Sequence, residues 1–128
     1  MKTEIIYIDD LNFEHVQWRN ELLFWNDELK SFNNRLAELV NRWTDKKVLA
    51  QLEHFQKQFN HNEEVVISLK RDIHAHEINM ATNDERGKDA LNTVFTKYHF
   101  ALRERMEIQR NIYGNLKKDF FRFLSKYM

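Results

Sequence analysis

Apolar residues recur along the first third of the chain at alternating intervals of four and three residues. This spacing keeps them on one face of an α-helix and is typical of helices that pack side by side along their length. The pattern predicts a helix over about residues 10–43, preceded by an N-terminal arm formed by residues 1–9. The predicted seam, meaning the line of residues on the packed face, contains Leu11, His15, Trp18, Leu22, Trp25, Leu29, Phe32, Leu36, Leu39 and Trp43.

A second seam with the same spacing begins after a short polar connection at residues 44–47. It predicts a helix over about residues 45–81, and we expect Thr44 to cap its start. Because the connection is so short, the second helix should pack antiparallel to the first. The second seam contains Leu52, Phe55, Phe59, Asn62, Val66, Leu69, Ile73, His76 and Met80.

A third helix is predicted over about residues 86–126, after a break at residues 82–87 that is rich in capping residues and ends in glycine. Its seam alternates in the same way up to Ile112 and then takes two successive steps of four residues. Such a slip, called a stutter, locally unwinds a left-handed supercoil, and the neighbouring Gly114 is compatible with a bend there. The third seam contains Leu91, Phe95, Tyr98, Leu102, Arg105, Gln109, Ile112, Leu116, Phe120, Phe123 and Tyr127.

The composition points to the same architecture. The chain of 128 residues has no proline and only two glycines, although hairpins and barrels need these residues at their turns. Three helices of similar length with short connections predict an all-α fold. We expect a single domain over residues 1–128, built as an up-down-up antiparallel three-helix bundle of long coiled-coil-like helices.

The charge balance and the lack of known motifs narrow the class of function. Lysine and arginine together number 20, as do aspartate and glutamate, so the net charge is zero. Nucleic-acid-binding domains normally carry a basic surplus, so no nucleic acid is expected as a partner. The chain has no cysteine, no apolar stretch of membrane-spanning length and no catalytic or nucleotide-binding motif. We therefore expect a cytoplasmic, non-enzymatic protein that needs no cofactor.

Two seam histidines should face each other across the first two helices. Antiparallel pairing places residues whose numbers sum to about 91 at the same level, and His15 and His76 meet this condition. Asp72 lies one turn from His76, so these three side chains could ligate Zn²⁺ or another divalent ion. The alternative is a hydrogen-bonded, partly hydrated polar layer, which the sequence favours because no repeated ligand motif accompanies the histidines.

A second polar level is predicted near the middle of the bundle. Asn62 of the second seam should lie level with the stretch between Arg105 and Gln109, and Glu28 should lie at a similar height on the first helix. An Arg105–Glu28 or an Asn62–Gln109 contact inside the bundle would fix the register of the helices, which is the best-attested role of buried polar groups.

Several apolar residues lie outside the seams and could form an interface. A monomeric bundle does not obviously bury all of them, so the sequence favours a homo-oligomer, most simply a homodimer, or a complex with another protein. Core-flanking positions are the alternative. The residues predicted at the interface are Leu23, Phe24, Ile67, Ile78 and Phe121.

The basic, aromatic end of the third helix, which contains Lys117 and Lys118, could contact a membrane surface or an acidic partner. Favourable interaction of these cations with the helix dipole is the simpler explanation. The sequence therefore predicts a non-enzymatic interaction or scaffold bundle that self-associates. The alternative is a small metal- or ligand-binding helical protein built around His15, His76 and Asp72.

Overall fold

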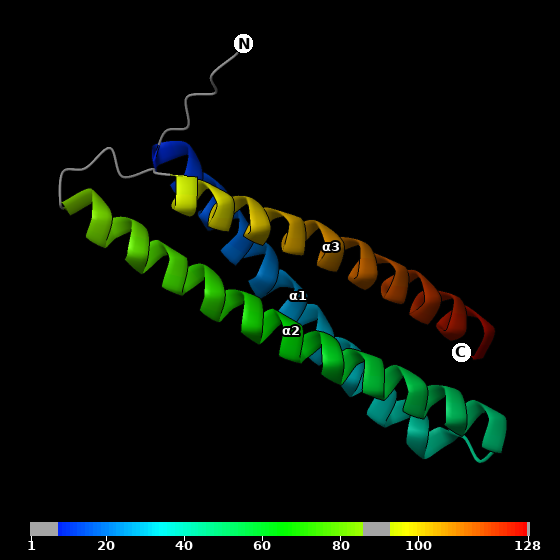
Figure 1. Ribbon diagram of the computed structural model, residues 1–128. Helices are drawn as coiled ribbons and strands as arrows, with labels where there is room; N and C mark the ends of the chain where they lie inside the picture. The colour runs from blue at the N-terminus through cyan, green and yellow to red at the C-terminus, as the bar shows by residue number, and fades with distance from the viewer. Residues whose placement is uncertain (1–7, 86–92, 128) are drawn as a thin grey trace, which may run out of the picture.

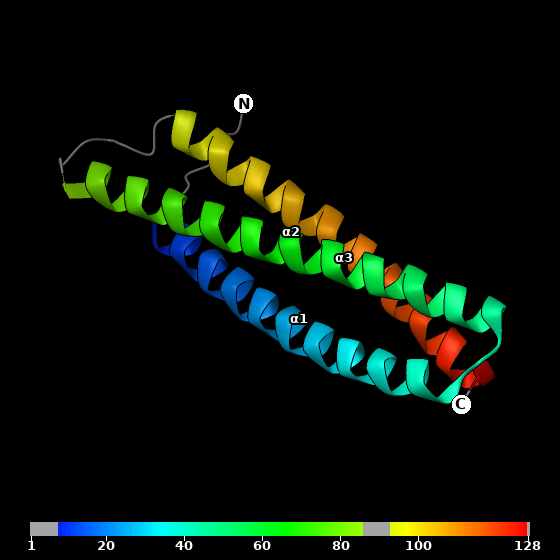
Figure 2. The ribbon, with the colours of Figure 1, turned by 90° about the horizontal axis from the view of Figure 1, so that it is seen from below.

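The computed structural model describes residues 8–85 and 93–127, and the surroundings of the side chains at 10–79 and 96–127. These residues form three α-helices, α1 (Ile8–Arg42), α2 (Lys46–Glu85) and α3 (Thr93–Tyr127) (Figure 1). Helix α2 runs antiparallel to α1, and α3 runs in the direction of α1, so that the C-terminus lies near the α1–α2 connection (Figures 1 and 2). The predicted all-α, up-down-up three-helix bundle is confirmed.

The helix bounds differ from the predicted ones at several points. Helix α1 begins at Ile8, inside the predicted arm, and α2 continues to Glu85, four residues beyond its predicted end. Polar residues such as those at 82–84 can cap a helix, but they do not stop one that has no proline or glycine. The rest of the arm, residues 1–7, and the predicted start of the third helix at residue 86 lie outside the described residues.

Asp45, and not Thr44 as predicted, caps the start of α2. Its carboxylate accepts hydrogen bonds from the backbone N–H groups of Lys47 at 2.8 Å and Val48 at 3.4 Å. These N–H groups lack partners within the helix, and a carboxylate satisfies them while opposing the positive end of the helix dipole. The connection between α1 and α2 consists of residues 43–45, and it is short enough for the antiparallel packing that the sequence predicted.

The core is the line along which the seams of the three helices meet. The predicted seam residues from Leu11 to Leu39 on α1 and from Leu52 to His76 on α2 are all buried, except for the half-buried Phe32. In the half of the bundle nearer the α1–α2 connection, aromatic rings fill this core with neighbouring centroids 4.9 to 5.4 Å apart. These rings belong to Phe32, Phe55, Phe59, Phe120 and Phe123.

The predicted seam of the third helix is correct at Leu102 and Gln109 but wrong at three other positions, while Leu91 and the side chain of Phe95 lie outside the described residues. Tyr98 and Ile112 are 47% and 49% exposed, and Arg105 is exposed as well. The buried residues are instead spaced by three and four without a slip, so the predicted stutter is wrong, and α3 continues through Gly114 as one helix. The buried face of α3 carries His99, Leu102, Met106, Gln109, Tyr113, Leu116, Phe120 and Phe123.

The predicted polar level contains one contact inside the core. Gln109 donates a hydrogen bond from Nε2 to Asn62 Oδ1 at 2.5 Å, and both residues are buried. Asn62 in turn donates from Nδ2 to the backbone carbonyl of Gln58 at 2.7 Å. Arg105 lies outside this level, because its guanidinium pairs with Asp72 at 2.8 Å on the surface. Glu28 instead accepts hydrogen bonds from Tyr113 and Lys117 of α3 at the edge of the core.

Helices α1 and α3 are joined along one edge by a ladder of ion pairs spaced seven residues apart. In each pair an acidic residue of α1 meets a basic residue exactly 89 positions later on α3, with N–O distances of 2.7 to 2.8 Å. This is the flanking-charge pattern that selects partner and orientation in coiled coils. The charge ladder consists of Glu14 with Arg103, Glu21 with Arg110, and Glu28 with Lys117.

Asn62 and Gln109 should stabilise the fold only as a pair, so loss of one partner should cost more stability than loss of both. Asn62→Leu leaves the buried amide of Gln109 without its partner and should lower the free energy of unfolding by about 1–3 kcal/mol. The double variant Asn62→Leu/Gln109→Leu should recover most of this loss, since neither polar group remains unpaired. Urea denaturation, followed by circular dichroism, measures the free energy of unfolding of the single and the double variant. Asn20→Leu, at an exposed position, is the control. Equal destabilisation in the single and double variants would contradict the pairing.

Candidate metal centre

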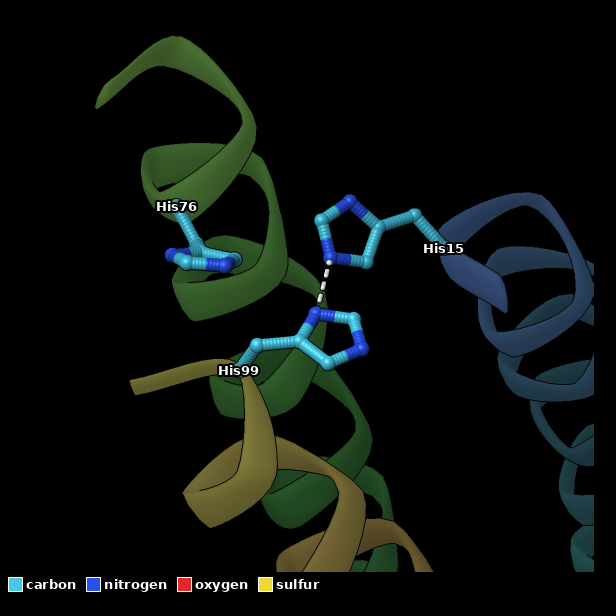
Figure 3. A group of neighbouring side chains, drawn as sticks. All are labelled: His15, His76 and His99. Carbon is cyan, nitrogen blue, oxygen red and sulfur yellow. Dashed lines mark hydrogen bonds between the residues drawn. The ribbon is translucent and has the colours of Figure 1, made fainter. Parts of the chain in front are cut away.

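One histidine from each helix meets in the core, in the half of the bundle away from the α1–α2 connection. His15 of α1, His76 of α2 and His99 of α3 are between 0% and 1% exposed, and their ring centroids lie 4.9 to 5.7 Å apart (Figure 3). One ring nitrogen from each lies within 4.8 Å of the others. We call these three residues the histidine cluster.

Hydrogen bonds determine which nitrogens of His15 and His99 carry protons. His99 Nε2 lies 2.5 Å from Glu14 Oε1, and because a carboxylate only accepts, His99 donates there. In the neutral imidazole, His99 Nδ1 is then an acceptor, and it lies 3.1 Å from His15 Nε2 (Figure 3). His15 therefore donates from Nε2, which leaves a lone pair on its Nδ1. That buried nitrogen has no hydrogen-bond partner among the described residues.

Glu14 is itself held in place by the first pair of the charge ladder. Arg103 donates to both of its carboxylate oxygens, from Nε and from a terminal nitrogen, each at 2.8 Å. Burial alone would raise the pKa of Glu14, but the hydrogen bonds from Arg103 and His99, together with the positive charge of Arg103, hold it below its usual value. The carboxylate is thus ionised and oriented, as is typical of groups that fix a metal-binding histidine from behind.

Burial keeps the cluster neutral. Removal from water lowers the pKa of both His15 and His76 to about 4, with a further contribution from the neighbouring rings. Burial also lowers the pKa of His99, although the hydrogen bond to Glu14 partly opposes this effect. Trp18 stacks on His99 with centroids 4.9 Å apart, and Tyr98 stacks on His76 at 5.1 Å, which adds apolar surface around the rings. Three uncharged imidazoles are the result at neutral pH.

Neutral imidazole is a strong ligand for Zn²⁺, Cu²⁺ and Ni²⁺. Two nitrogens bound to one tetrahedral zinc ion lie about 3.3 Å apart, because each Zn–N bond measures about 2.0–2.1 Å. The facing nitrogens of His15 and His99 lie 3.1 Å apart, and a nitrogen of His76 belongs to a set of three that lie within 4.8 Å of one another. The cluster thus has the ligand type and the spacing for one transition-metal ion.

The structure brings together two of the three predicted metal ligands and replaces the third. His15 and His76 lie with their ring centroids 5.3 Å apart, at the level that antiparallel pairing predicts. Asp72 points instead to Arg105. His99 takes the third position, which the sequence analysis missed because it assigned Tyr98 to the packed face. A step of three residues back from Leu102, in place of the step of four that leads to Tyr98, would have found it.

The predicted interface residues all lie at the surface, on three different helices. Their exposed fractions range from 48% to 62%. Helix α1 also exposes Phe13 and Val16, which the sequence analysis did not select. The predicted interface residues are Leu23 and Phe24 on α1, Ile67 and Ile78 on α2, and Phe121 on α3.

Comparison of the chain with protein-family models, with curated proteins and with solved structures returns no match. Within the described residues, no helix combines the length and the apolar character that crossing a membrane requires. Function is therefore inferred from the side-chain geometry alone.

The histidine cluster should make the metal-free protein sensitive to acid. The pKa of His15 and His76 is about 4 in the folded protein and about 6.5 in an unfolded chain, so the unfolded state binds protons first as the pH falls. The free energy of unfolding should be unaffected by these groups above pH 7. It should fall by about 2 kcal/mol per histidine between pH 7 and pH 5.

Urea denaturation at a series of pH values checks this slope. The variant His15→Gln/His76→Gln should lose most of it, whereas His54→Gln, at an exposed position, should keep it. A wild-type protein that is equally stable at pH 7 and pH 5 would contradict the buried, neutral state of the cluster.

Proposed function

We propose that this protein binds one divalent transition-metal ion, with Zn²⁺ as the best fit, through His15, His76 and His99. The observation that carries the proposal is the convergence of three buried histidines from three separate helices, with nitrogens within 4.8 Å of one another. Glu14 supports it, because it orients His99 through the ring nitrogen that lies away from His15. A carboxylate behind a histidine is the usual arrangement around bound zinc.

The comparison with the Asn62–Gln109 pair favours a metal ion over a simple polar layer. In that pair the donor of Gln109 is matched to the acceptor of Asn62, as suits a contact that fixes the register of two helices. The histidine cluster instead has one hydrogen bond between its rings, from His15 to His99, and leaves His15 Nδ1 without a partner among the described residues. It is therefore not a fully matched polar layer. A move of the His15 proton from Nε2 to Nδ1 would turn the Nε2 lone pair toward His99 and supply a ligand.

A metal ion held there would link all three helices away from the α1–α2 connection. Because the three ligands come from different helices and are almost fully buried, the ion would stabilise the folded state and would have little contact with solvent. The proposed role is structural metal binding or metal retention and requires no catalysis.

Zinc titration of the metal-free protein tests this proposal. We expect binding of one Zn²⁺ per chain and a rise in the melting temperature, which grows with free zinc because only the folded state binds it. His99→Ala should abolish both effects. Asp72→Asn and His54→Ala should preserve them, since these residues lie outside the histidine cluster. Equal zinc affinity in wild type and His99→Ala would exclude the site.

A variant outside the ligand set keeps the test valid if His99→Ala does not fold. Glu14→Ala removes the carboxylate that orients His99 and should weaken zinc binding about 10–100-fold. Glu21→Ala removes the next acid of the charge ladder and is the matched control, with unchanged zinc affinity. If both variants lost affinity equally, the effect would belong to the ladder and the orienting role of Glu14 would be wrong.

As a second candidate function, we propose self-association through the outward side of α1. Four apolar side chains at helical spacing support it, each between 44% and 65% exposed: Phe13, Val16, Leu23 and Phe24. A stripe of this kind on one helix gives two copies of the chain an elongated surface to bury against each other.

The oligomeric state across a concentration series tests the second candidate. Wild type should sediment as a dimer at tens of micromolar. Leu23→Ser/Phe24→Ser should be monomeric, since it removes two of the exposed apolar side chains. Ile67→Ser, on α2, is the matched control and should remain dimeric. A wild type that stays monomeric over the whole series would rule out this interface.

A further inference from the structure

A groove lies between the first turns of α2 and the last turns of α3. These turns lie at the end of the bundle that carries the α1–α2 connection (Figure 1), away from the histidine cluster. Its volume is about 450 Å³, within the range of about 300–1,000 Å³ that is common for small-molecule sites. Neither the metal-binding proposal nor the α1 surface involves it.

The floor of the groove is apolar and aromatic. Phe55 and Phe123 are almost fully buried, with centroids 5.3 Å apart, and Tyr127 lies 4.9 Å from Phe123. Ala50 borders the groove from α2 with only a methyl group. The small side chain at this position leaves space between the helices that a larger residue would fill.

The rim of the groove is mainly basic. Arg122 and Lys126, one turn apart on α3, both line it, and the only acid among its lining residues is Asp119. Asp119 pairs loosely with Arg122 at 3.6 Å, and both side chains are largely exposed. Lys126 lies over the ring of Tyr127 at 5.4 Å from its centroid. The rim thus has one positive charge in excess, directly beside the aromatic floor.

We propose that this groove binds a medium-chain fatty carboxylate. An apolar floor with a cationic rim matches an acyl tail that ends in one negative charge. The α3 segment that lines the groove, from Asp119 to Tyr127, is about 12 Å long at 1.5 Å per residue, which suits an extended tail of about ten carbons. The tail lies against Phe55, Phe123 and Tyr127, and the carboxylate lies between Arg122 and Lys126.

A membrane surface is a poorer match for this end of α3. Lys117, one of the two lysines that suggested membrane contact, donates to both carboxylate oxygens of Glu28 at 2.9 and 2.8 Å. Its charge is therefore neutralised within the bundle. Of the three phenylalanines at this end of α3, Phe120 and Phe123 are buried and only Phe121 is exposed, whereas insertion into a lipid layer requires a continuous apolar face.

Titration with decanoate, below the concentration at which it forms micelles, tests the proposal by calorimetry. Wild type should bind one decanoate per chain, and the uncharged decanol should bind more weakly. Arg122→Glu/Lys126→Glu reverses the charge of the rim and should weaken decanoate binding at least about tenfold. Lys118→Glu changes an exposed cation of the same helix outside the groove and should leave the affinity unchanged.

A second variant tests the groove itself. Ala50→Trp fills it from an exposed position of α2 and should block decanoate while the helical circular dichroism and the zinc affinity stay the same. Saturable binding of decanoate that survives both Ala50→Trp and the charge reversal would overturn the proposal. So would the absence of decanoate binding to wild type, including the case in which the protein co-sediments only with anionic phospholipid vesicles.

Discussion

Burial of one continuous seam per helix is the interaction on which the rest of the structure depends. Each helix repeats its packed residues at steps of three and four, so that leucines and aromatic rings from all three helices meet along the full length of the bundle. Amphipathic helices in a folded protein gain most of their stability from such packing, and less from the intrinsic helix propensity of their residues. The seam also sets where polar groups can meet. His15, His76 and His99 converge because each occupies a seam position at a matching height on its own helix, and Asn62 and Gln109 do so for the same reason.

Charged side chains line the edges of this core, and two of them, Glu14 and Glu28, form hydrogen bonds with buried side chains. The charge ladder ties α1 to α3 along a side that α2 does not cover, and its first member, Glu14, also holds His99. The orientation of a buried ring is thereby connected to an arginine at the surface. The pair formed by Glu28 and Lys117 has a similar connection, since Glu28 also accepts a hydrogen bond from the buried Tyr113 at 2.9 Å. These contacts explain why polar side chains deep in the bundle can have fixed positions.

The sequence predicted the architecture and two of the three helix faces, but it did not predict the complete candidate site. The seams of α1 and α2 were unambiguous, because only one phase of each helix was consistently apolar. On α3 two phases compete, and Tyr98 and Ile112 are apolar enough to suggest the wrong one. The choice is settled by packing against α1 and α2, which propensity and spacing do not contain. One signal could have settled it: Arg103, Arg110 and Lys117 recur every seven residues, and residues that flank a seam with regular charges mark its edge. Nothing comparable in the sequence shows that Asp72 turns toward Arg105.

The regularity of the charge ladder limits what it can determine about the alignment of α1 and α3. If α3 slid along α1 by seven residues, about 10 Å, two of the three ion pairs could form again with new partners. Glu21 would then meet Arg103, and Glu28 would meet Arg110. Small displacements of α3 along α1 therefore break the ion pairs of the ladder, whereas displacement by a whole heptad lets two of them form again. The larger shift is disfavoured by contacts that do not repeat every seven residues, because it would separate their partners. The Asn62–Gln109 pair and the histidine cluster are contacts of this kind. Substitution of either by leucine could leave a protein that is stable and helical, yet aligned in more than one way.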